Sequence, residues 1–228
     1  MKTVDADEEA GTLLTIGENA YRRIRSDIIF GRLSPGQKLK LEKLRDPYGA
    51  SISTLREILN RLSSEGLVLA EGQRGFEVAP VSAENLKEIA ALRLLLETHA
   101  LEESFAAGDM EWEGRVVAAH HKLARLEARM REGDRSETEL WKRYDWEFHQ
   151  ALISACGSKV LMDAHAGVFD KYLRYQMIAL SFRGDIAAME HKIMHDSALA
   201  RDAATARDVL RRHVEGGVEH ALATGTIR

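Results

Sequence analysis

Residues 39–79 carry the pattern that most constrains the fold: a helix, a tight turn, a second helix and a β-hairpin in succession. Leu41 to Tyr48 has the length of a short helix, and Tyr48-Gly49-Ala50 is expected to form the turn after it. Ser51 or Ser53 can cap the second helix, because a serine hydroxyl there accepts a hydrogen bond from a backbone N–H that lacks a partner within the helix. Apolar residues then recur with the spacing of one buried helix face, at Leu55, Ile58, Leu59 and Leu62.

A glycine-rich hairpin follows this second helix. Gly66 is expected to end the helix, since glycine tolerates a positive φ angle. Two short apolar runs, Leu67–Ala70 and Phe76–Ala79, are joined by Glu71-Gly72-Gln73-Arg74-Gly75, which is the pattern of a two-stranded wing. A capped helix between a tight turn and a wing is an arrangement that presents a helix to the major groove of DNA. We therefore expect DNA contacts from Ser51, Ser53, Thr54, Arg56, Arg61, Arg74 and Gly75.

The charge of the chain is distributed unevenly. Residues 20–76 contain eleven Lys and Arg against six Asp and Glu, a net charge of +5, whereas the whole chain carries −4 and the remainder therefore −9. A basic N-terminal part suits contact with phosphates, and an acidic C-terminal part does not. The alternative is a winged helix that serves as a protein-interaction module, but the basic charge favours DNA as the partner.

Length and composition limit the remaining classes of protein. At 228 residues there is room for two compact domains, and 45% apolar with 30% charged residues is ordinary for a soluble globular protein. The start, MKTVDADEEAG, is acidic and polar, unlike a signal or transit peptide. No apolar run approaches the roughly 20 residues that cross a bilayer, and a single cysteine, Cys156, fits a reducing compartment. We expect a cytoplasmic protein without a membrane partner.

Three segments are expected: a disordered tail over 1–14, the winged helix-turn-helix over 15–80 and an all-helical domain over 81–225. Within the second segment, a helix from about Glu18 to Phe30 comes first, and Lys38–Lys40 can form a small strand that pairs with the wing. All three prolines lie at or before Pro80, which leaves the third segment free to be helical.

The third segment shows helical periodicity throughout. A long helix that begins near Ser82 carries the apolar residues Leu86, Ile89, Leu92, Leu96 and Ala100. Breaks are expected at Gly108-Asp109, Gly133-Asp134, Gly157-Ser158, Gly184-Asp185 and Arg201-Asp202. The sequence therefore predicts a mainly α fold, with a bundle of six or seven helices after the winged helix-turn-helix.

Asp145 and His149 are the pair of residues that most strongly indicates a functional site in the third segment. Four residues apart, they lie about 40° apart around a helix, on the face that also carries Trp141, Phe148 and Leu152. Asp145 is therefore expected to point into the core, where a carboxylate is unfavourable unless it finds a cation or several donors. Pairing of Asp145 with an arginine is the alternative to a metal ion.

Two further histidines are expected to reach this carboxylate. Ile186–Ala200 and Ala204–Ala223 have the pattern of a helical hairpin that turns near Asp202. His191 and His213 each lie eleven residues from Asp202, so an antiparallel pair of helices brings them to the same level. One carboxylate with three imidazoles and no thiolate suits one divalent transition metal such as Zn, Ni or Mn. Solvated or packing roles are expected for His99, His120, His121, His165 and His220.

Several motifs together resemble a known family. In order they are SPGQKL, STLREILNRLSSEGLV and QRGFEVAPVS, then ALRLLLE, YDWEFHQALISACGS, EHKIMHDSALARDA and LRRHVEG. The first three resemble the GntR family of bacterial transcription regulators, and the others resemble the FCD effector domain of its FadR-type branch. The resemblance implies a homodimer that binds palindromic operator DNA, usually as a repressor, and responds to a small carboxylate. It also implies that Asp145, His149, His191 and His213 are metal ligands.

One position departs from the family pattern. The family commonly has an arginine where this chain has Ile52, at the start of the second helix of the motif. The pattern of base contacts is therefore not carried over by the resemblance, and Ser53, Thr54 and Arg56 are left as candidate base-reading residues.

Arg93 is the first candidate to bind the effector carboxylate, since a guanidinium makes bidentate contacts to such a group. The resemblance also implies that the arginine of the ALRLLLE motif lines the effector pocket. The alternative for Arg93 is an i,i+4 ion pair with Glu97. Arg174 is a second candidate, and His195 is a third, for which the sequence slightly favours the alternative role of a core histidine. A metal-dependent enzyme acting on a small organic acid is the alternative function. We expect a regulator without catalytic residues, because no further Asp or Glu is expected at the site as a general base.

Overall fold

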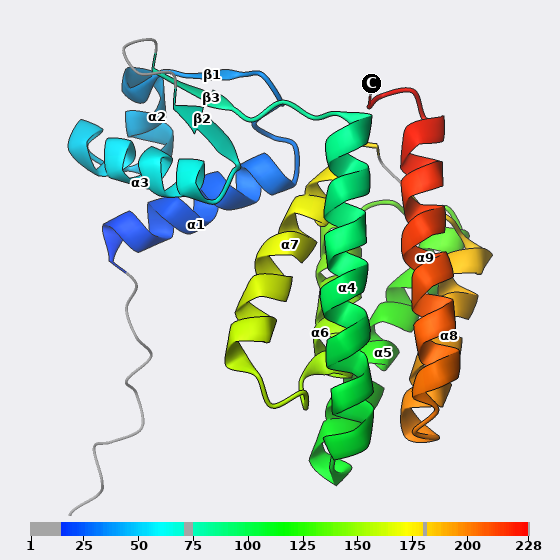
Figure 1. Cartoon of the computed structure of the whole chain (residues 1–228). Helices are drawn as coiled ribbons and strands as arrows, with labels where there is room; N and C mark the ends of the chain where they lie inside the picture. The colour runs from blue at the N-terminus through cyan, green and yellow to red at the C-terminus, as the bar shows by residue number, and fades with distance from the viewer. Residues whose placement is uncertain (1–14, 71–74, 180–181, 228) are drawn as a thin grey trace, which may run out of the picture. The chain divides into compact units, whose positions relative to one another are not determined.

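The computed structural model describes residues 15–70, 75–179 and 182–227, and the chain divides into two compact units (Figure 1). The first unit comprises residues 1–28 with 32–80, and the second comprises 29–31 with 81–228. The tail expected over 1–14 lies outside the described residues, and so does Arg74 of the wing.

The first unit is built, in its described part, from three helices and a three-stranded antiparallel sheet. The elements are α1 (Ile16–Ile29), β1 (Lys38–Leu39), α2 (Leu41–Tyr48), α3 (Ile52–Ser64), β2 (Val68–Ala70) and β3 (Phe76–Val78). The strand order is β1-β3-β2, with Lys38 opposite Glu77 and Val68 opposite Val78. The strand expected before the helix-turn-helix therefore does pair with the wing.

Local chemistry explains where α2 ends and α3 begins. Gly49 has a φ of 62°, the left-handed conformation in which the chain leaves α2. The Ser51 hydroxyl then accepts a hydrogen bond from the backbone N–H of Thr54 at 3.2 Å, so Ser51 and not Ser53 is the cap. The expected apolar face of α3 is buried in the core of this unit: Leu55, Ile58, Leu59 and Leu62.

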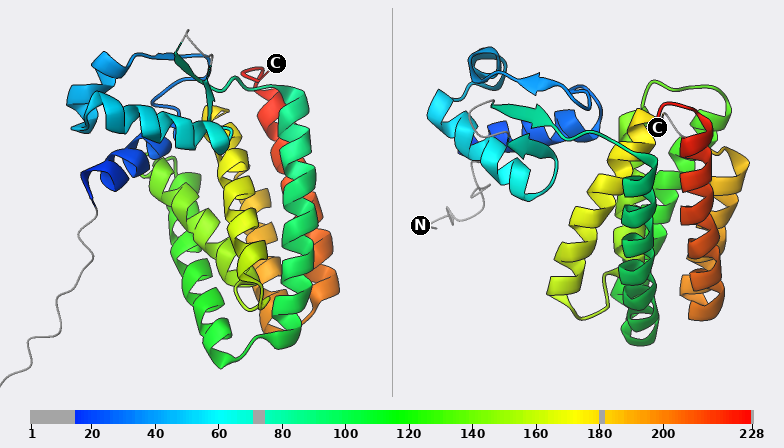
Figure 2. Two further views of the ribbon diagram at one scale, coloured as in Figure 1. Left: turned by 60° about the vertical axis from the view of Figure 1, so that its left-hand side comes forward. Right: turned by 45° about the horizontal axis from the view of Figure 1, so that its top comes forward.

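The second unit contains six helices within its described residues, packed as a bundle (Figure 2). They are α4 (Ala83–Ala107), α5 (Met110–Arg131), α6 (Thr138–Ile153), α7 (Lys159–Ile178), α8 (Asp185–Leu199) and α9 (Ala203–Ala223). Each of the five expected breaks separates two of these helices, so the mainly α architecture is confirmed. None of the described helices combines the length and the apolar character that spanning a membrane requires.

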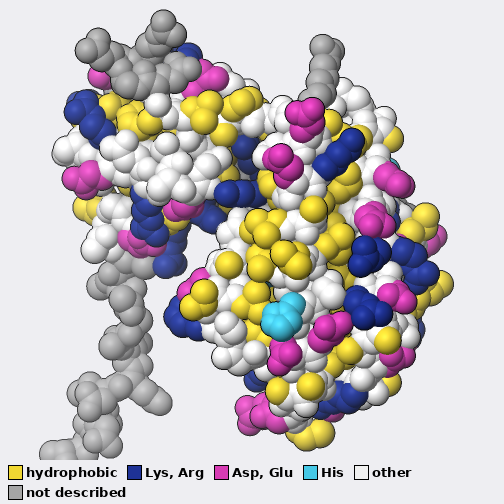
Figure 3. All heavy atoms as spheres, in the orientation of Figure 1, with side chains coloured by type: hydrophobic (Ala, Val, Ile, Leu, Met, Phe, Trp, Pro, Cys, Tyr) yellow, Lys and Arg dark blue, Asp and Glu magenta, His cyan; other side chains and the backbone are white. Residues whose placement is uncertain are grey.

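The buried face of α4 differs from the apolar stripe expected for it. Leu92 is 45% exposed, whereas the neighbouring Arg93 is buried together with Glu97. Apolar side chains gather over α4 on the face drawn in Figure 3, and Leu92 and Leu95 are exposed apolar residues of this helix. The helix is therefore rotated so that a polar pair, and not a continuous apolar stripe, faces the interior midway along it.

Candidate metal centre and nucleic-acid interface

Four buried side chains meet inside the second unit. Asp145 and His149 come from α6, His191 from α8 and His213 from α9. One potential ligand atom from each residue lies within 4.8 Å of the other three. The imidazole centroid of His191 lies 4.6 Å from that of His213 and 5.7 Å from that of His149. The structure thus brings together the four residues that the spacing on α6 and on the α8–α9 hairpin selected.

Each of the three imidazoles donates its Nδ1–H to a buried or half-buried carboxylate. Metal-binding histidines commonly make this contact, which fixes the ring and leaves the Nε2 lone pair for the metal. The pairs are His149 with Glu97 of α4, His191 with Glu127 of α5 (2.6 Å) and His213 with Glu190 of α8 (2.9 Å). Three helices therefore orient the rings from outside the cluster.

The opposite edges of two of these rings remain available for a ligand. The Nε2 atoms of His149 and His191 are buried and have no aligned hydrogen-bond partner, although His191 Nε2 lies 3.2 Å from Asp145 Oδ1. Buried polar atoms in proteins are almost always satisfied, and a divalent cation among these donors would satisfy both nitrogens. Imidazole nitrogens and a carboxylate oxygen are donors that Zn, Ni and Mn accept. The residues present could therefore hold such an ion.

Burial and neighbouring charges set the protonation states of the cluster. Burial lowers the pKa of His149 and, with the neighbouring imidazoles, holds the pKa of His213 well below its usual value. Burial also opposes the charged form of His191, but Glu127 and Asp145 outweigh it and raise the pKa of His191 to about 9. For Asp145, the cationic neighbours outweigh burial and hold the pKa well below its usual value. His149, His213 and Asp145 are thus in the states that metal ligation requires at neutral pH, whereas His191 has a proton to lose.

Lys142 is the ammonium group that contacts Asp145. It lies one turn earlier on α6, with its Nζ 3.4 Å from Asp145 Oδ2 and its side chain buried. Burial lowers the pKa of Lys142, although Asp145 opposes this shift. Among the described residues, the ion-pair contacts of Asp145 are with Lys142, His149 and His191. The alternative to a metal ion was an arginine paired with Asp145, but the cationic side chain that contacts Asp145 is a lysine.

Two features of this site were not predicted from the sequence. Further carboxylates do lie at the site, as the contacts of Glu97, Glu127 and Glu190 with the imidazoles demonstrate. His165, for which no partner was expected, is fully buried and donates from Nε2 to Glu97 at 3.1 Å, while its Nδ1 accepts from Gln150 at 2.7 Å. For one of these carboxylates the sequence did carry a signal: Glu127 lies on the same face of α5 as the buried apolar residues, which indicates that it points into the bundle.

The candidate effector residues occupy different surroundings. Arg93 forms the i,i+4 ion pair with Glu97 that was its alternative role, at 2.7 Å between Nε and Oε2, with both side chains buried. Arg93 also lines a narrow cavity of about 20 Å³ at the cluster. Arg174 and His195 do not line this cavity: Arg174 is buried in α7, and His195 stacks on His120 with ring centroids 4.3 Å apart.

The outer face of α3 carries most of the residues expected to meet DNA. Ser51, Ser53 and Arg56 are exposed and Thr54 is half-buried. The Ser51 hydroxyl lies 2.8 Å from that of Ser53 and 2.9 Å from that of Thr54, so three hydroxyls gather at the start of the helix. Arg56 and Gly75 line a hollow of about 670 Å³ whose other lining residues include the basic Lys38 and Lys40.

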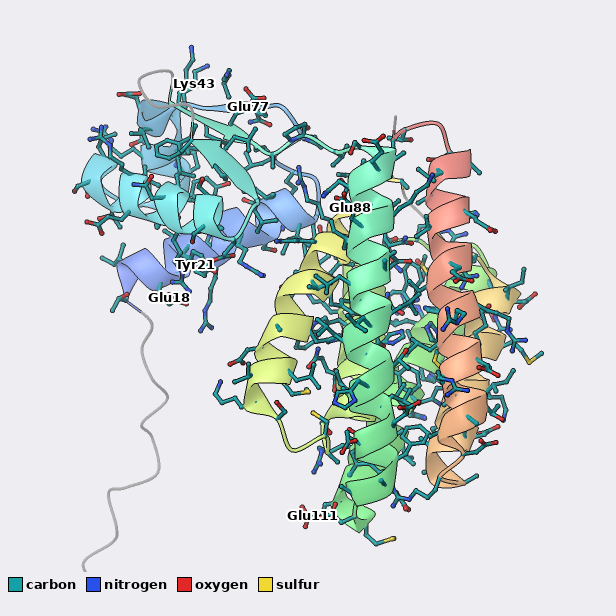
Figure 4. All side chains as sticks on the ribbon, in the orientation of Figure 1. Glu18, Tyr21, Lys43, Glu77, Glu88 and Glu111 are labelled. Atoms are coloured by element: carbon teal, nitrogen blue, oxygen red, sulfur yellow. The ribbon has the colours of Figure 1, made fainter. Side chains whose placement is uncertain are left out.

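Arg61 is engaged inside the first unit. Its guanidinium lies 3.5 Å from the ring centre of Tyr21 and forms an ion pair with Glu18 at 3.1 Å. Both partners belong to α1 and are labelled in Figure 4. A contact at 3.7 Å with Glu65 adds to this arrangement. Arg61 therefore joins α3 to α1, and it does not line the basic hollow that contains Arg56.

A winged helix-turn-helix unit with a helical bundle that encloses ligand-type side chains defines the class of DNA-binding transcription regulators. Residues 16–78 match the bacterial regulatory proteins of the gntR family, and residues 88–216 match the FCD domain. The chain belongs to the GntR family and has the FadR-type architecture, with an FCD domain after the DNA-binding domain.

Individual relatives and solved structures agree with this assignment. The uncharacterized HTH-type transcriptional regulator BphR of Paraburkholderia xenovorans strain LB400 is 36% identical over 213 residues, which cover 92% of this chain and 87% of that protein. The HTH-type transcriptional repressor GlaR of Escherichia coli K12 is 34% identical over 206 residues, 86% of this chain and 91% of that protein. The structure of E. coli McbR/YncC has a TM-score of 0.77 over 92% of this chain and 99% of that one, at 17% identity, which is a likeness of fold. The curated relatives are transcriptional regulators, consistent with a non-enzymatic role.

Proposed function

We propose that this regulator is a repressor whose affinity for operator DNA is set by a small carboxylate bound beside one divalent metal ion in the bundle. The observation that carries the proposal is the set of three histidines whose Nδ1–H groups are held by carboxylates while two buried Nε2 atoms lack an aligned partner. The proposed ligands are Asp145, His149, His191 and His213. A bound ion supplies a positive charge that attracts a carboxylate oxygen.

The DNA contacts are proposed to come from the first unit. Ser53, Thr54 and Arg56 of α3 are assigned to the major groove, and Arg74 and Gly75 to the wing, which follows the docking geometry of helix-turn-helix proteins. Ser51 acts mainly as the helix cap, because its hydroxyl accepts from Thr54. The basic lining of the hollow beside Arg56 supports contact with phosphates there.

Control of DNA binding is proposed to work through a homodimer. A palindromic operator has two half-sites, so two DNA-binding units related by a two-fold axis are needed to occupy it. The effector regulates only if it binds the DNA-competent and DNA-incompetent dimers with different affinities. The repressor role is supported by the relative named as a repressor, GlaR.

A metal-dependent enzyme is the weaker candidate. The carboxylates found at the site each accept a hydrogen bond from an imidazole, and Glu97 and Glu190 also pair with Arg93 and Arg183. A carboxylate engaged in this way is a poor general base, since its lone pairs are occupied and its charge is stabilised. The cluster thus resembles a metal-binding site whose ligands are held in place more than a catalytic site with a free general base.

The decisive experiment is a gel shift on the DNA that flanks the gene, made with metal-loaded protein, with metal-free protein and with a panel of organic acids. We expect a retarded complex that at least one acid weakens, and only in the metal-loaded protein. Turnover of the same acids is followed in parallel by product analysis. Consumption of an acid by the protein, with no effect of any acid on the shifted complex, would favour the enzyme instead.

A further inference from the structure

Arg201 has a backbone conformation that glycine adopts much more readily than other residues. Its φ is 59°, and of the described residues other than glycine it alone has a positive φ. It lies in the turn between α8 and α9, where the backbone N–H of Asp202 donates to the carbonyl of Ser197 at 2.9 Å and that of Arg201 donates to the carbonyl of Ala198 at 3.2 Å. These two bonds form a Schellman motif, in which glycine usually occupies the left-handed position. An arginine there is strained, so a role is expected for its side chain.

The side chain of Arg201 reaches the turn between α4 and α5. Its Nη2 donates to the carbonyl oxygen of Gly108 at 2.9 Å and to Glu113 Oε1 at 2.6 Å, and its guanidinium lies 4.5 Å from the ring centre of Trp112. A Cβ added to Gly108 would lie 2.7 Å from Arg201 Nη1 and would also meet the Trp112 ring. The absence of a side chain at Gly108 therefore lets the guanidinium lie against the backbone of this turn.

Trp112 extends this connection to α6. Its side chain is fully buried, and its Nε1 donates to the carbonyl of Leu152 at 3.3 Å. Leu152 follows His149 by three residues on α6. Through Trp112, Arg201 thus joins the α8–α9 hairpin, which carries two of the candidate metal ligands, to the helix that carries the other two.

The position of the hairpin along the bundle decides whether its histidines reach the cluster. His191 lies ten residues before Arg201 and His213 twelve residues after it, which is roughly 15–18 Å along each helix. The turn fixes α8 relative to α9, but only contacts with other helices fix the hairpin along α4, α5 and α6. A slip of one residue moves a helical side chain by about 1.5 Å and turns it by about 100°. Metal–ligand distances vary by only about 0.2 Å, so such a slip would remove both imidazoles from the site.

A second arginine joins the same hairpin to α4 in a more exposed place. Arg207 Nη1 lies 3.3 Å from Glu102 Oε1, with the two side chains 42% and 44% exposed. An exposed ion pair of this kind contributes little to stability. Arg201 makes its charged contact together with a backbone contact and a contact with a buried ring, so it is expected to hold the hairpin more firmly.

We propose that Arg201 is a positioning residue that holds the α8–α9 hairpin in register with α4, α5 and α6. In this register His191 and His213 lie level with the two candidate ligands of α6. The contacts of the guanidinium offset the strain of the left-handed backbone, which explains why the position holds an arginine and not a glycine. The inference rests on the proposed function, since its consequence is metal binding.

The register can be measured without metal. Spin labels are placed at two exposed positions, Met189→Cys on α8 and Val160→Cys on α7, with Cys156→Ser to remove the native thiol. The labelled protein is diluted with unlabelled protein, so that only distances within one chain are recorded by pulsed electron paramagnetic resonance. We expect one narrow distribution in the background with Arg201 and a broadened or shifted one with Arg201→Gly. An unchanged distribution would overturn the proposal.

Zinc titration of the full-length protein measures the consequence for the site. Arg201→Gly should bind zinc at least tenfold more weakly, the scale seen when the orientation of metal ligands is lost. Its helix content by circular dichroism should equal that of the wild type, because glycine adopts the left-handed conformation without strain. Gly108→Ala disturbs the same contact from the other side and should weaken zinc binding too. Arg207→Gln is the matched control and should bind zinc as the wild type does.

Two outcomes separate this inference from the proposed function. If the wild type takes up no zinc but Arg201→Gly changes the distance distribution, the proposed function fails and the role of Arg201 in register stands. If the wild type binds zinc and Arg201→Gly and Gly108→Ala bind it equally well, only the positioning role of Arg201 fails. An equal loss of zinc affinity in Arg207→Gln would also overturn it, because any contact between the hairpin and α4 would then serve.

Discussion

Nδ1 of His191 and Oε1 of Glu127 lie 2.6 Å apart, and both side chains are buried inside the bundle. The carboxylate orients the ring, raises the basicity of the imidazole and directs Nε2 toward Asp145. It also stabilises a proton on His191, whose pKa is about 9. The same contact therefore orients a proposed metal ligand and would make metal binding depend on pH.

Metal affinity should rise with pH across the neutral range. His191 carries a proton below a pH of about 9 in the metal-free protein, and a metal ion needs the neutral ring, so binding releases that proton. The apparent affinity should fall about tenfold for each unit of pH below about 9 while this single proton is displaced. Competition with a chelator between pH 6.5 and 8.5 measures the slope. Glu127→Gln should flatten the dependence of metal affinity on pH. The control is Glu132→Gln, at the exposed end of α5. A wild-type metal affinity that does not change with pH would contradict this account.

His213→Ala should lose most of the bound metal. The variant removes one of three proposed nitrogen ligands, and it leaves the three contacts of Asp145 with Lys142, His149 and His191 in place. The response of operator binding to the effector should be blunted, whereas basal operator binding should persist because the proposed DNA-contacting residues belong to the other compact unit. Elemental analysis after purification without chelator gives the metal content. His220→Ala on the same helix is the control, and an empty wild-type site after incubation with Zn, Ni and Mn would refute the metal assignment.

Arg56→Ala should weaken operator binding without unfolding the protein. If Arg56 contacts a base, the loss should be about 1–3 kcal/mol; if it contacts a phosphate, the salt dependence should fall by about one ion. Fluorescence anisotropy over a range of salt concentrations distinguishes the two. Arg61→Ala is the contrasting variant, because its contacts with Tyr21 and Glu18 predict a loss of stability of the first unit. Unchanged affinity and salt slope in Arg56→Ala would remove Arg56 from the DNA surface.

The protein should be a homodimer at micromolar concentration. Two DNA-binding units are needed to occupy the two halves of a palindromic operator. Sedimentation velocity with and without operator DNA measures the mass of the protein and of the complex. A monomer in both conditions, or one chain per operator, would rule out the two-fold arrangement.

Local sequence patterns determined much of this protein. The Gly49 turn, the apolar face of α3 and the five breaks between the bundle helices follow from interactions within a few residues, so periodicity and capping chemistry predict them. The Asp145–His149 spacing places both residues on one face of α6. The equal separation of His191 and His213 from Asp202 aligns them across one hairpin. Two antiparallel helices joined by a short turn place residues equally distant from the turn at the same level, which is why the sequence alone predicts that these candidate ligands lie together.

The tertiary structure decided what surrounds those candidate ligands. Glu97 and Glu127 lie 52 and 64 residues from the histidines they orient, on helices that the sequence predicts without indicating which neighbour each one meets. Arg61 likewise has an exposed helical position, and only the packing of α1 directs it toward Tyr21. Helical periodicity reports which face of a helix is buried but carries no information on the rotation and pairing of helices distant in the chain. Those depend on how all the side chains of the core fit together at once.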